Sequence, residues 1–147
     1  MKHTQKVRLI TVLACLLALI CGSFAFFKWY NQPKQVFQRN KTELEAVISD
    51  YLATETLSWP ELPGVQSVNV WGNEEPIVEF LTGSFGITPA STYRGFYYSV
   101  SGKPVSFQAG NEPLIPVKNG WEWKGRGDNG GFTQHIEGNW YSFEAYF

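Results

Sequence analysis

The last 28 residues, "GWEWKGRGDNGGFTQHIEGNWYSFEAYF" (Gly120–Phe147), decide the fold. They contain three runs in which every second residue is large and apolar, for example Trp121 and Trp123 in the first run. This period of two is typical of β-strands, whose side chains point alternately to the two faces of a sheet. The glycine- and asparagine-rich segments "RGDNGG" and "EGN" separate the runs. The pattern predicts a three-stranded antiparallel meander.

The final run divides its side chains between two faces. One face carries Tyr141, Phe143, Ala145 and Phe147, and the other carries Trp140, Ser142, Glu144 and Tyr146. The first set is the more apolar, so we expect Phe143 and Phe147 in the core with Tyr141 beside them.

The segment between the first two runs predicts a tight hairpin turn. Asn129-Gly130 between alternating runs is a strong signal for a primed turn, which needs positive φ at both central residues. Two other interpretations are an integrin-type tripeptide at Arg126–Asp128 and a calcium loop beginning at Asp128. Calcium needs six to eight oxygen ligands, and Gly130 and Gly131 stand where such ligands should be. We therefore expect a turn and no metal.

Upstream, a period of two returns before the meander. The predicted strands are Gln66–Trp71, Pro76–Leu81, Tyr93–Val100 and Pro104–Gln108. The first two form a hairpin around Gly72-Asn73, and a turn at Ser101–Lys103 leads into the fourth. The segments 82–92, "TGSFGITPAST", and 109–119 are rich in Gly, Pro, Ser and Thr or carry two prolines, and are expected to be loops.

Ahead of the strands, one helix is expected from Lys34 to about Ala53. Phe37, Leu44 and Tyr51 fall on one side at helical spacing. A stalk or a partner-binding helix is the alternative, but a predicted sheet needs a cover. The fold class is therefore α+β: one amphipathic helix across an antiparallel, strongly curved sheet of about six or seven strands.

The N-terminus predicts an export segment. Residues 9–27, "LITVLACLLALICGSFAFF", contain no charge and no Pro over 19 residues, close to the span of a bilayer. Lys2, Lys6 and Arg8 precede it, which favours the N-terminus inside and the remainder outside the cytoplasmic membrane. Cleavage after Ala25 would instead release a secreted protein, and "VLAC", ending at Cys15, faintly resembles a lipoprotein box. The chain divides into an anchor region, 1–28, and an extracytoplasmic domain, 29–147.

Composition excludes several function classes for the domain. Residues 29–147 hold eight basic and 13 acidic residues, a net charge of −5, and nucleic-acid binding needs a basic footprint instead. Both cysteines, Cys15 and Cys21, lie in the apolar segment, so the domain has neither a disulfide nor thiol chemistry.

Catalytic chemistry is not indicated. His135 is the one histidine of the domain and is expected on the surface of a strand, because no nucleophile motif or metal-ligand cluster accompanies it. A glycosidase would need two carboxylates facing one cleft. The candidates are Glu79, Glu122, Asp128, Glu137 and Glu144, and their spacing singles out no pair. We expect a non-enzyme with no cofactor and no metal.

Aromatic side chains are the candidate binding residues. Trp121, Trp123, Trp140 and Tyr146 lie on predicted strands, where exposed rings stack on sugars or anchor protein interfaces. The interpretation that we favour for the tryptophans is that their rings fill the core of a small domain without disulfides.

The segments "GDNGGFTQHIEGNWYSFEAYF" and "YRGFYYS" resemble the ends of small, N-terminally anchored, uncharacterised exported proteins of Gram-positive bacteria. The resemblance implies an extracytoplasmic bacterial setting and no particular activity. We expect a binding or accessory module that acts on an envelope protein, which includes an immunity-type role against an incoming toxin. A cell-wall or carbohydrate-binding module is the alternative.

Overall fold

The computed structural model describes residues 12–23, 32–87 and 90–147 and divides into two units, Met1–Gln32 and Pro33–Phe147. In the first unit, residues 12–23 are helical. Among the residues that the structure describes, no helix combines the length and the apolar character that a membrane crossing requires. The ends of the predicted anchor, 9–11 and 24–27, and with them the cleavage site at Ala25, lie outside the described residues.

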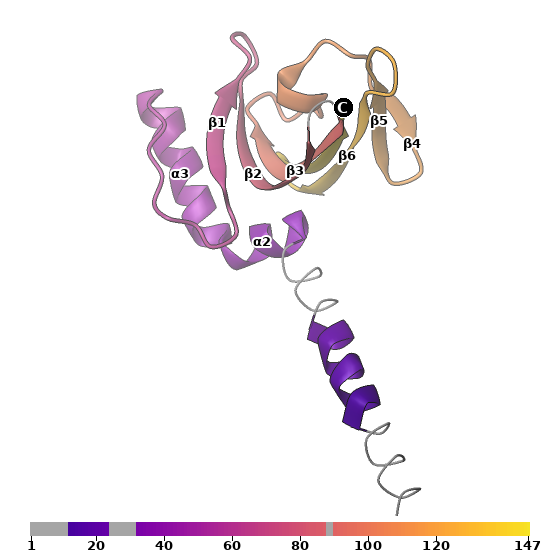
Figure 1. Cartoon of the computed structure of the whole chain (residues 1–147). Coiled ribbons are helices and arrows are strands. Elements are labelled where there is room, and N and C mark those ends of the chain that lie inside the picture. The colour runs from indigo at the N-terminus through magenta and orange to yellow at the C-terminus, as the bar shows by residue number, and fades with distance from the viewer. Residues whose placement is uncertain (1–11, 24–31, 88–89) are drawn as a thin grey trace, which may run out of the picture. The chain divides into compact units, whose positions relative to one another are not determined.

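The second unit is an α+β domain built on one seven-stranded antiparallel sheet. The strands are β1 (Ser67–Trp71), β2 (Ile77–Ile87), β3 (Ala90–Ser99), β4 (Ile115–Val117), β5 (Gly120–Lys124), β6 (Gly130–Glu137) and β7 (Trp140–Tyr146). Their order is β1-β2-β3-β7-β6-β5-β4, and the sheet curves strongly (Figure 1). The predicted class and the C-terminal meander β5-β6-β7 are confirmed, and β7, the last strand of the chain, lies in the middle of the sheet.

The prediction of one continuous helix was wrong, because the chain forms α2 (Pro33–Arg39) and α3 (Lys41–Thr54) with a break at Asn40. The buried Asn40 amide Nδ2 donates to the carbonyl oxygens of Val36, at 2.8 Å, and Pro63, at 3.0 Å. The second partner belongs to the loop that precedes β1. Asn side chains compete with the helical backbone for such bonds, so a tertiary contact sets the break.

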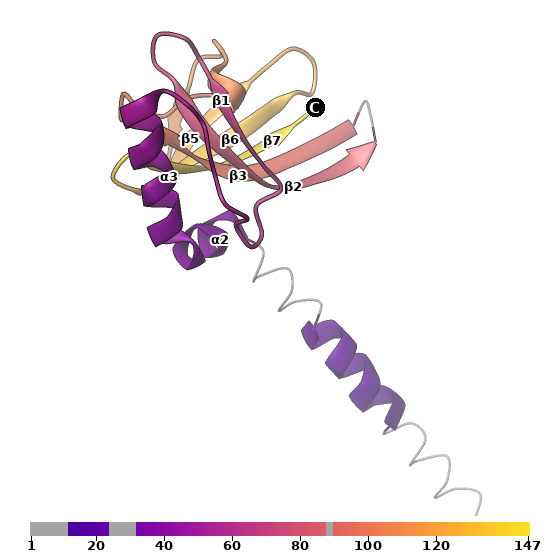
Figure 2. The same cartoon turned by 90° about the vertical axis from the view of Figure 1, so that its left-hand side faces the viewer.

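The loop prediction for residues 82–92 was also wrong. β2 continues to Ile87 and pairs with β3, with Phe85 opposite Thr92 and Ile87 opposite Ala90, after a register shift between Leu81 and Gly83. The two strands extend past the rest of the sheet as a long hairpin (Figure 2). The glycines of this stretch are typical of a loop, but cross-strand pairing outweighs that local preference.

Two shorter predictions also fail between β3 and β5. The strand expected at Pro104–Gln108 is absent, and the short 3₁₀ helix η1 (Phe107–Ala109) forms there instead. The edge strand β4 lies inside the expected loop 109–119.

Each face of the sheet carries one hydrophobic core. On the helix face, Phe37 and Leu44 pack against Phe80, Phe96 and Trp140. On the opposite face, Ile77, Tyr97, Tyr141 and Phe143 form a second core beneath the chain that contains Val105 and Phe107.

At its start, β7 contributes to both cores. Tyr141 and Phe143 are buried as predicted, and Trp140, expected on the outer face, is 5% exposed in the helix-side core. The prediction that Phe147 is a core residue was wrong, because this terminal residue is 36% exposed beyond the end of β7.

The turn between β5 and β6 lies earlier than predicted. The amide of Asn129 donates to the carbonyl of Arg126 over 3.4 Å, and Gly127, with φ of 68°, is the residue in the left-handed region. Neither Asn129 nor Gly130 has positive φ, which corrects the prediction of a primed turn centred on them.

Candidate binding site

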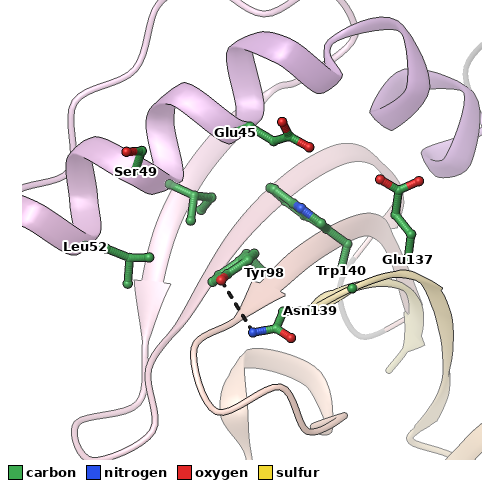
Figure 3. Close-up of a pocket in the computed structure, with 9 residues that line it drawn as sticks. Glu45, Ser49, Leu52, Tyr98, Glu137, Asn139 and Trp140 are labelled. Atoms are coloured by element: carbon green, nitrogen blue, oxygen red, sulfur yellow. Dashed lines mark hydrogen bonds between the residues drawn. The ribbon is translucent and has the colours of Figure 1, made fainter.

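An open groove lies between α3 and the turn that joins β6 to β7. Its cavity of about 510 Å³ is lined by Glu45, Ile48, Ser49, Leu52, Tyr98, Glu137, Gly138, Asn139 and Trp140. Figure 3 shows Glu45, Ser49 and Leu52 on α3, which forms one side of the groove, and Tyr98 and Trp140 on the other side.

The floor of the groove is aromatic and held by packing. The ring of Trp140 lies 5.1 Å from that of Phe37 and 5.2 Å, edge to face, from that of Tyr98. The Tyr98 hydroxyl accepts a long hydrogen bond of 3.4 Å from Asn139 Nδ2 (Figure 3). Rings fixed in this way form a surface that needs little rearrangement to receive a ligand.

The opposite wall comes from α3. Ile48 points into the helix-side core, whereas Leu52, one helical turn later, is 49% exposed. The groove thus passes from a buried apolar floor to an apolar side chain that is open to solvent. Exposed apolar surface beside polar groups is typical of interaction sites.

The rim is acidic. Lys41 forms an ion pair of 2.5 Å with Glu137 and lies 4.0 Å from Glu45. The hydrogen bond from Lys41 to Glu137 raises the pKa of Lys41, so this cation stays charged at neutral pH. One ammonium group shared between two carboxylates leaves these three groups with a net negative charge.

A second, smaller hollow lies near β4 and β5. It measures about 350 Å³ and is lined by Pro116, Val117, Asn119, Gly120, Trp121, Gln134 and His135. The half-buried Trp121 ring meets Tyr141 edge to face at 6.2 Å, and His135 Nε2 lies 2.9 Å from the carbonyl oxygen of Gly138. The prediction that His135 lies on the surface of a strand is confirmed.

The fold does not bring the four predicted binding residues together. Trp140 lines the groove and Trp121 lines the smaller hollow. Trp123, 3% exposed, lies against Phe147, and Tyr146 is 46% exposed on the helix-side face of β7. Their roles in ligand binding stay predictions.

The five candidate carboxylates are also dispersed. Glu137 is at the groove, Glu144 pairs with Arg94 at 3.0 Å, and Glu122 and Asp128 are exposed. Glu79 is 2% exposed and accepts a hydrogen bond of 3.1 Å from Trp71 Nε1. Burial raises the pKa of Glu79 to about 7, and the Trp71 bond opposes that rise.

Sequence reasoning missed most of the groove. Glu45, Leu52, Tyr98 and Asn139 were not singled out, because they become neighbours only when α3 packs over β3 and β7. The available signal was the i, i+4 spacing of Ile48 and Leu52, which places an apolar pair on one side of the helix.

Comparisons with protein families, with curated proteins and with solved structures each return no match. The candidate site is therefore interpreted from its geometry.

Proposed function

We propose that this chain is a membrane-anchored, extracytoplasmic and non-catalytic module that binds an envelope protein through the groove between α3 and the β6–β7 turn. The observation that carries the proposal is an aromatic floor beside Leu52 under a rim with Glu45 and Glu137. A Lys or Arg side chain of the partner fits this arrangement. Its methylene stem covers Leu52 and Trp140, and its cationic head meets the carboxylates.

The extracytoplasmic setting is supported by the sequence. The uncharged residues 9–27 follow Lys2, Lys6 and Arg8, which favours a membrane segment with the domain outside. An acidic domain that faces the cell exterior suits a partner with basic side chains, and an incoming toxin neutralised by an immunity-type protein is one such partner.

The test is capture of a partner by the full-length chain in mild detergent from an envelope extract, followed by affinity measurement with the purified partner. The double variant Glu45→Gln/Glu137→Gln should weaken binding at least tenfold and reduce its dependence on salt, because the rim charges are removed. Leu52→Ser should weaken binding with the salt dependence retained.

Glu122→Gln on β5 is the matched control, since Glu122 is an exposed carboxylate away from the groove. It changes the net charge by one and should leave the affinity within about twofold of wild type. A loss of binding free energy in the control of about half that in the double variant, in proportion to the charge removed, would show that overall charge, rather than the groove, attracts the partner.

A carbohydrate-binding function is the second candidate, and the smaller hollow favours it. A half-exposed Trp121 ring stands there beside the polar side chains of Asn119 and Gln134, a combination that suits a sugar with one apolar face. Titration with cell-wall oligosaccharides should quench tryptophan fluorescence in wild type and not in Trp121→Ala. An unchanged signal in both proteins would exclude this hollow as a sugar site.

A further inference from the structure

The outer edge of β2 is unpaired over its last six residues, Thr82–Ile87. β1 pairs with β2 only as far as Ser67 opposite Leu81, followed by a bond of 2.7 Å from the Gln66 amide to the Leu81 carbonyl. Within the described part of the chain, no further strand continues this edge. The chain before β1 turns toward α2, because Gly64 lies against Val36.

This edge carries no Lys, no Pro and, among the described residues, no covering segment, and its irregularities are the register shift between Leu81 and Gly83, at its start, and Gly86 with φ of 117°. The stretch "TGSFGI" carries neither a charge nor a Pro, and its large side chains Phe85 and Ile87 are 86% and 87% exposed. Edge strands of native monomers are usually protected by Lys, Pro or a covering segment. An uncharged edge with two exposed apolar side chains on one face is suited to pairing with another strand.

We infer that β2 of one copy pairs antiparallel with β2 of a second copy along residues 83–87, with the two-fold axis at Phe85. The register follows from the structure. In an antiparallel pair, residues that lie opposite each other point to the same face of the sheet. When the two strands are copies related by a two-fold axis, the axis must therefore pass between one residue and the same residue of the other copy. An axis at Ser84 would bring Ile87 opposite Leu81, whose outer edge β1 already occupies. An axis at Gly86 would pair only residues 85–87 of the described strand.

The side chains are complementary in this register. Phe85 meets its symmetry mate, and Ile87 lies opposite Gly83 of the other copy. A Cβ placed at Gly83 would have no neighbour within 4 Å, so room exists there for the Ile87 side chain. With no charge in the paired segment, two identical strands meet without repulsion. This inference does not depend on the groove or on the proposed function.

Cysteine cross-linking of the full-length chain in mild detergent tests the register, in a background with Cys15→Ala and Cys21→Ala. Residues opposite each other in antiparallel strands have Cα atoms about 4.5–5.5 Å apart, within the range of a disulfide. Phe85→Cys should therefore give a covalent dimer on mild oxidation. Ile87→Cys is the matched control, equally exposed on the same hairpin. Its thiols would lie four residues apart along the strand direction, about 14 Å at roughly 3.4 Å per residue, and should remain unlinked.

The association itself is measured by light scattering of the protein without added cysteines. Wild type should dimerise with rising concentration. Phe85→Lys should raise the protein concentration at which half of the chains are dimeric at least tenfold. Val117→Lys, on the opposite edge strand β4, should leave this concentration unchanged. A monomer at every concentration, or dissociation by Val117→Lys instead, would overturn the inference, and equal cross-linking of both cysteine variants would overturn the register.

Discussion

At the scale of single residues, Glu79 is a carboxyl held in the second core with one hydrogen-bond donor, Trp71 Nε1. Its pKa of about 7 exceeds the ordinary value of 4.5, and burial is the main cause. Tyr97, its cross-strand neighbour on β3, also has a pKa raised by burial, to about 12. Glu79 therefore titrates near neutral pH.

The first prediction concerns stability against pH. Because the folded pKa lies above the unfolded one, the folded state holds the extra proton between about pH 4.5 and 7. The part of the free energy of unfolding that depends on protonated Glu79 is fully present below about pH 4.5 and decreases as the pH rises through this window. Above about pH 7 it is lost, and the total decrease is about 3 kcal/mol. Thermal melts of wild type should show the decline. Glu79→Gln should flatten it and be the more stable protein at pH 8. A parallel decline in the variant would assign the effect to another group.

The second prediction concerns Gly131, which follows the β5–β6 turn. A Cβ at Gly131 would lie 2.5 Å from the Glu144 carbonyl oxygen and 2.6 Å from the Trp123 ring, so neither neighbour moves easily. Gly131→Ala should lower the free energy of unfolding by about 1–3 kcal/mol or more. Asp128→Ala, in the exposed turn, should change it by less than about 0.5 kcal/mol. Chemical denaturation of both variants checks the order, and a larger loss for Asp128→Ala would indicate that the turn holds a structural contact.

At the scale of elements, β7 is the strand that links the two cores. The Phe143 ring contacts those of Tyr97 and Phe107, whereas Trp140 contacts Phe37 and Phe80 on the opposite face. The alternation of residues along the β7 sequence gives one apolar face and one face with both polar and apolar side chains. The helix-side cover buries Trp140 on the second face, whereas Glu144 and Tyr146 on that face stay exposed.

The third prediction follows from this central position. Phe143→Ala should destabilise the domain by about 3–5 kcal/mol, since the ring is 6% exposed and its removal leaves a cavity. Phe147→Ala is the matched control, because it removes the same type of side chain just after the end of β7. Its ring is 36% exposed, so the loss should be well below that of Phe143→Ala. Equal losses in urea unfolding would show that the chain end is packed more tightly than its exposure indicates.

At the scale of the whole molecule, the proposed anchor makes a prediction about topology. If residues 9–27 cross the membrane uncleaved, the intact chain should sediment with membranes, and protease added outside intact cells should remove the domain. A tag at the N-terminus should stay protected from this protease, because the N-terminus is expected inside the cell. Mature protein in the medium that begins at Phe26 would replace the anchor with a cleaved signal sequence.

Much of the sheet follows from the sequence, because alternation of apolar residues is a local property. It located β1, the first half of β2, β3 and the meander, and it placed Tyr141 and Phe143 in a core. Glycine was the main source of error. Local rules treat "TGSFGITPAST" as a loop, but pairing of Gly83–Ile87 with residues 90–94 makes it a hairpin. Propensity is a weak guide wherever a neighbouring strand supplies the hydrogen bonds.

The sequence by itself therefore determined the α+β class, the strand faces and the acidic charge of the domain. The tertiary structure alone decided three features. The break at Asn40 depends on the Pro63 carbonyl, 23 residues away. The burial of Trp140 on one face of β7 and of Tyr141 and Phe143 on the other depends on covers from distant segments. The groove depends on α3 lying beside the β6–β7 turn. The physical reason is common to all three: contacts between residues far apart in the chain outweigh local preferences, and no local pattern records them.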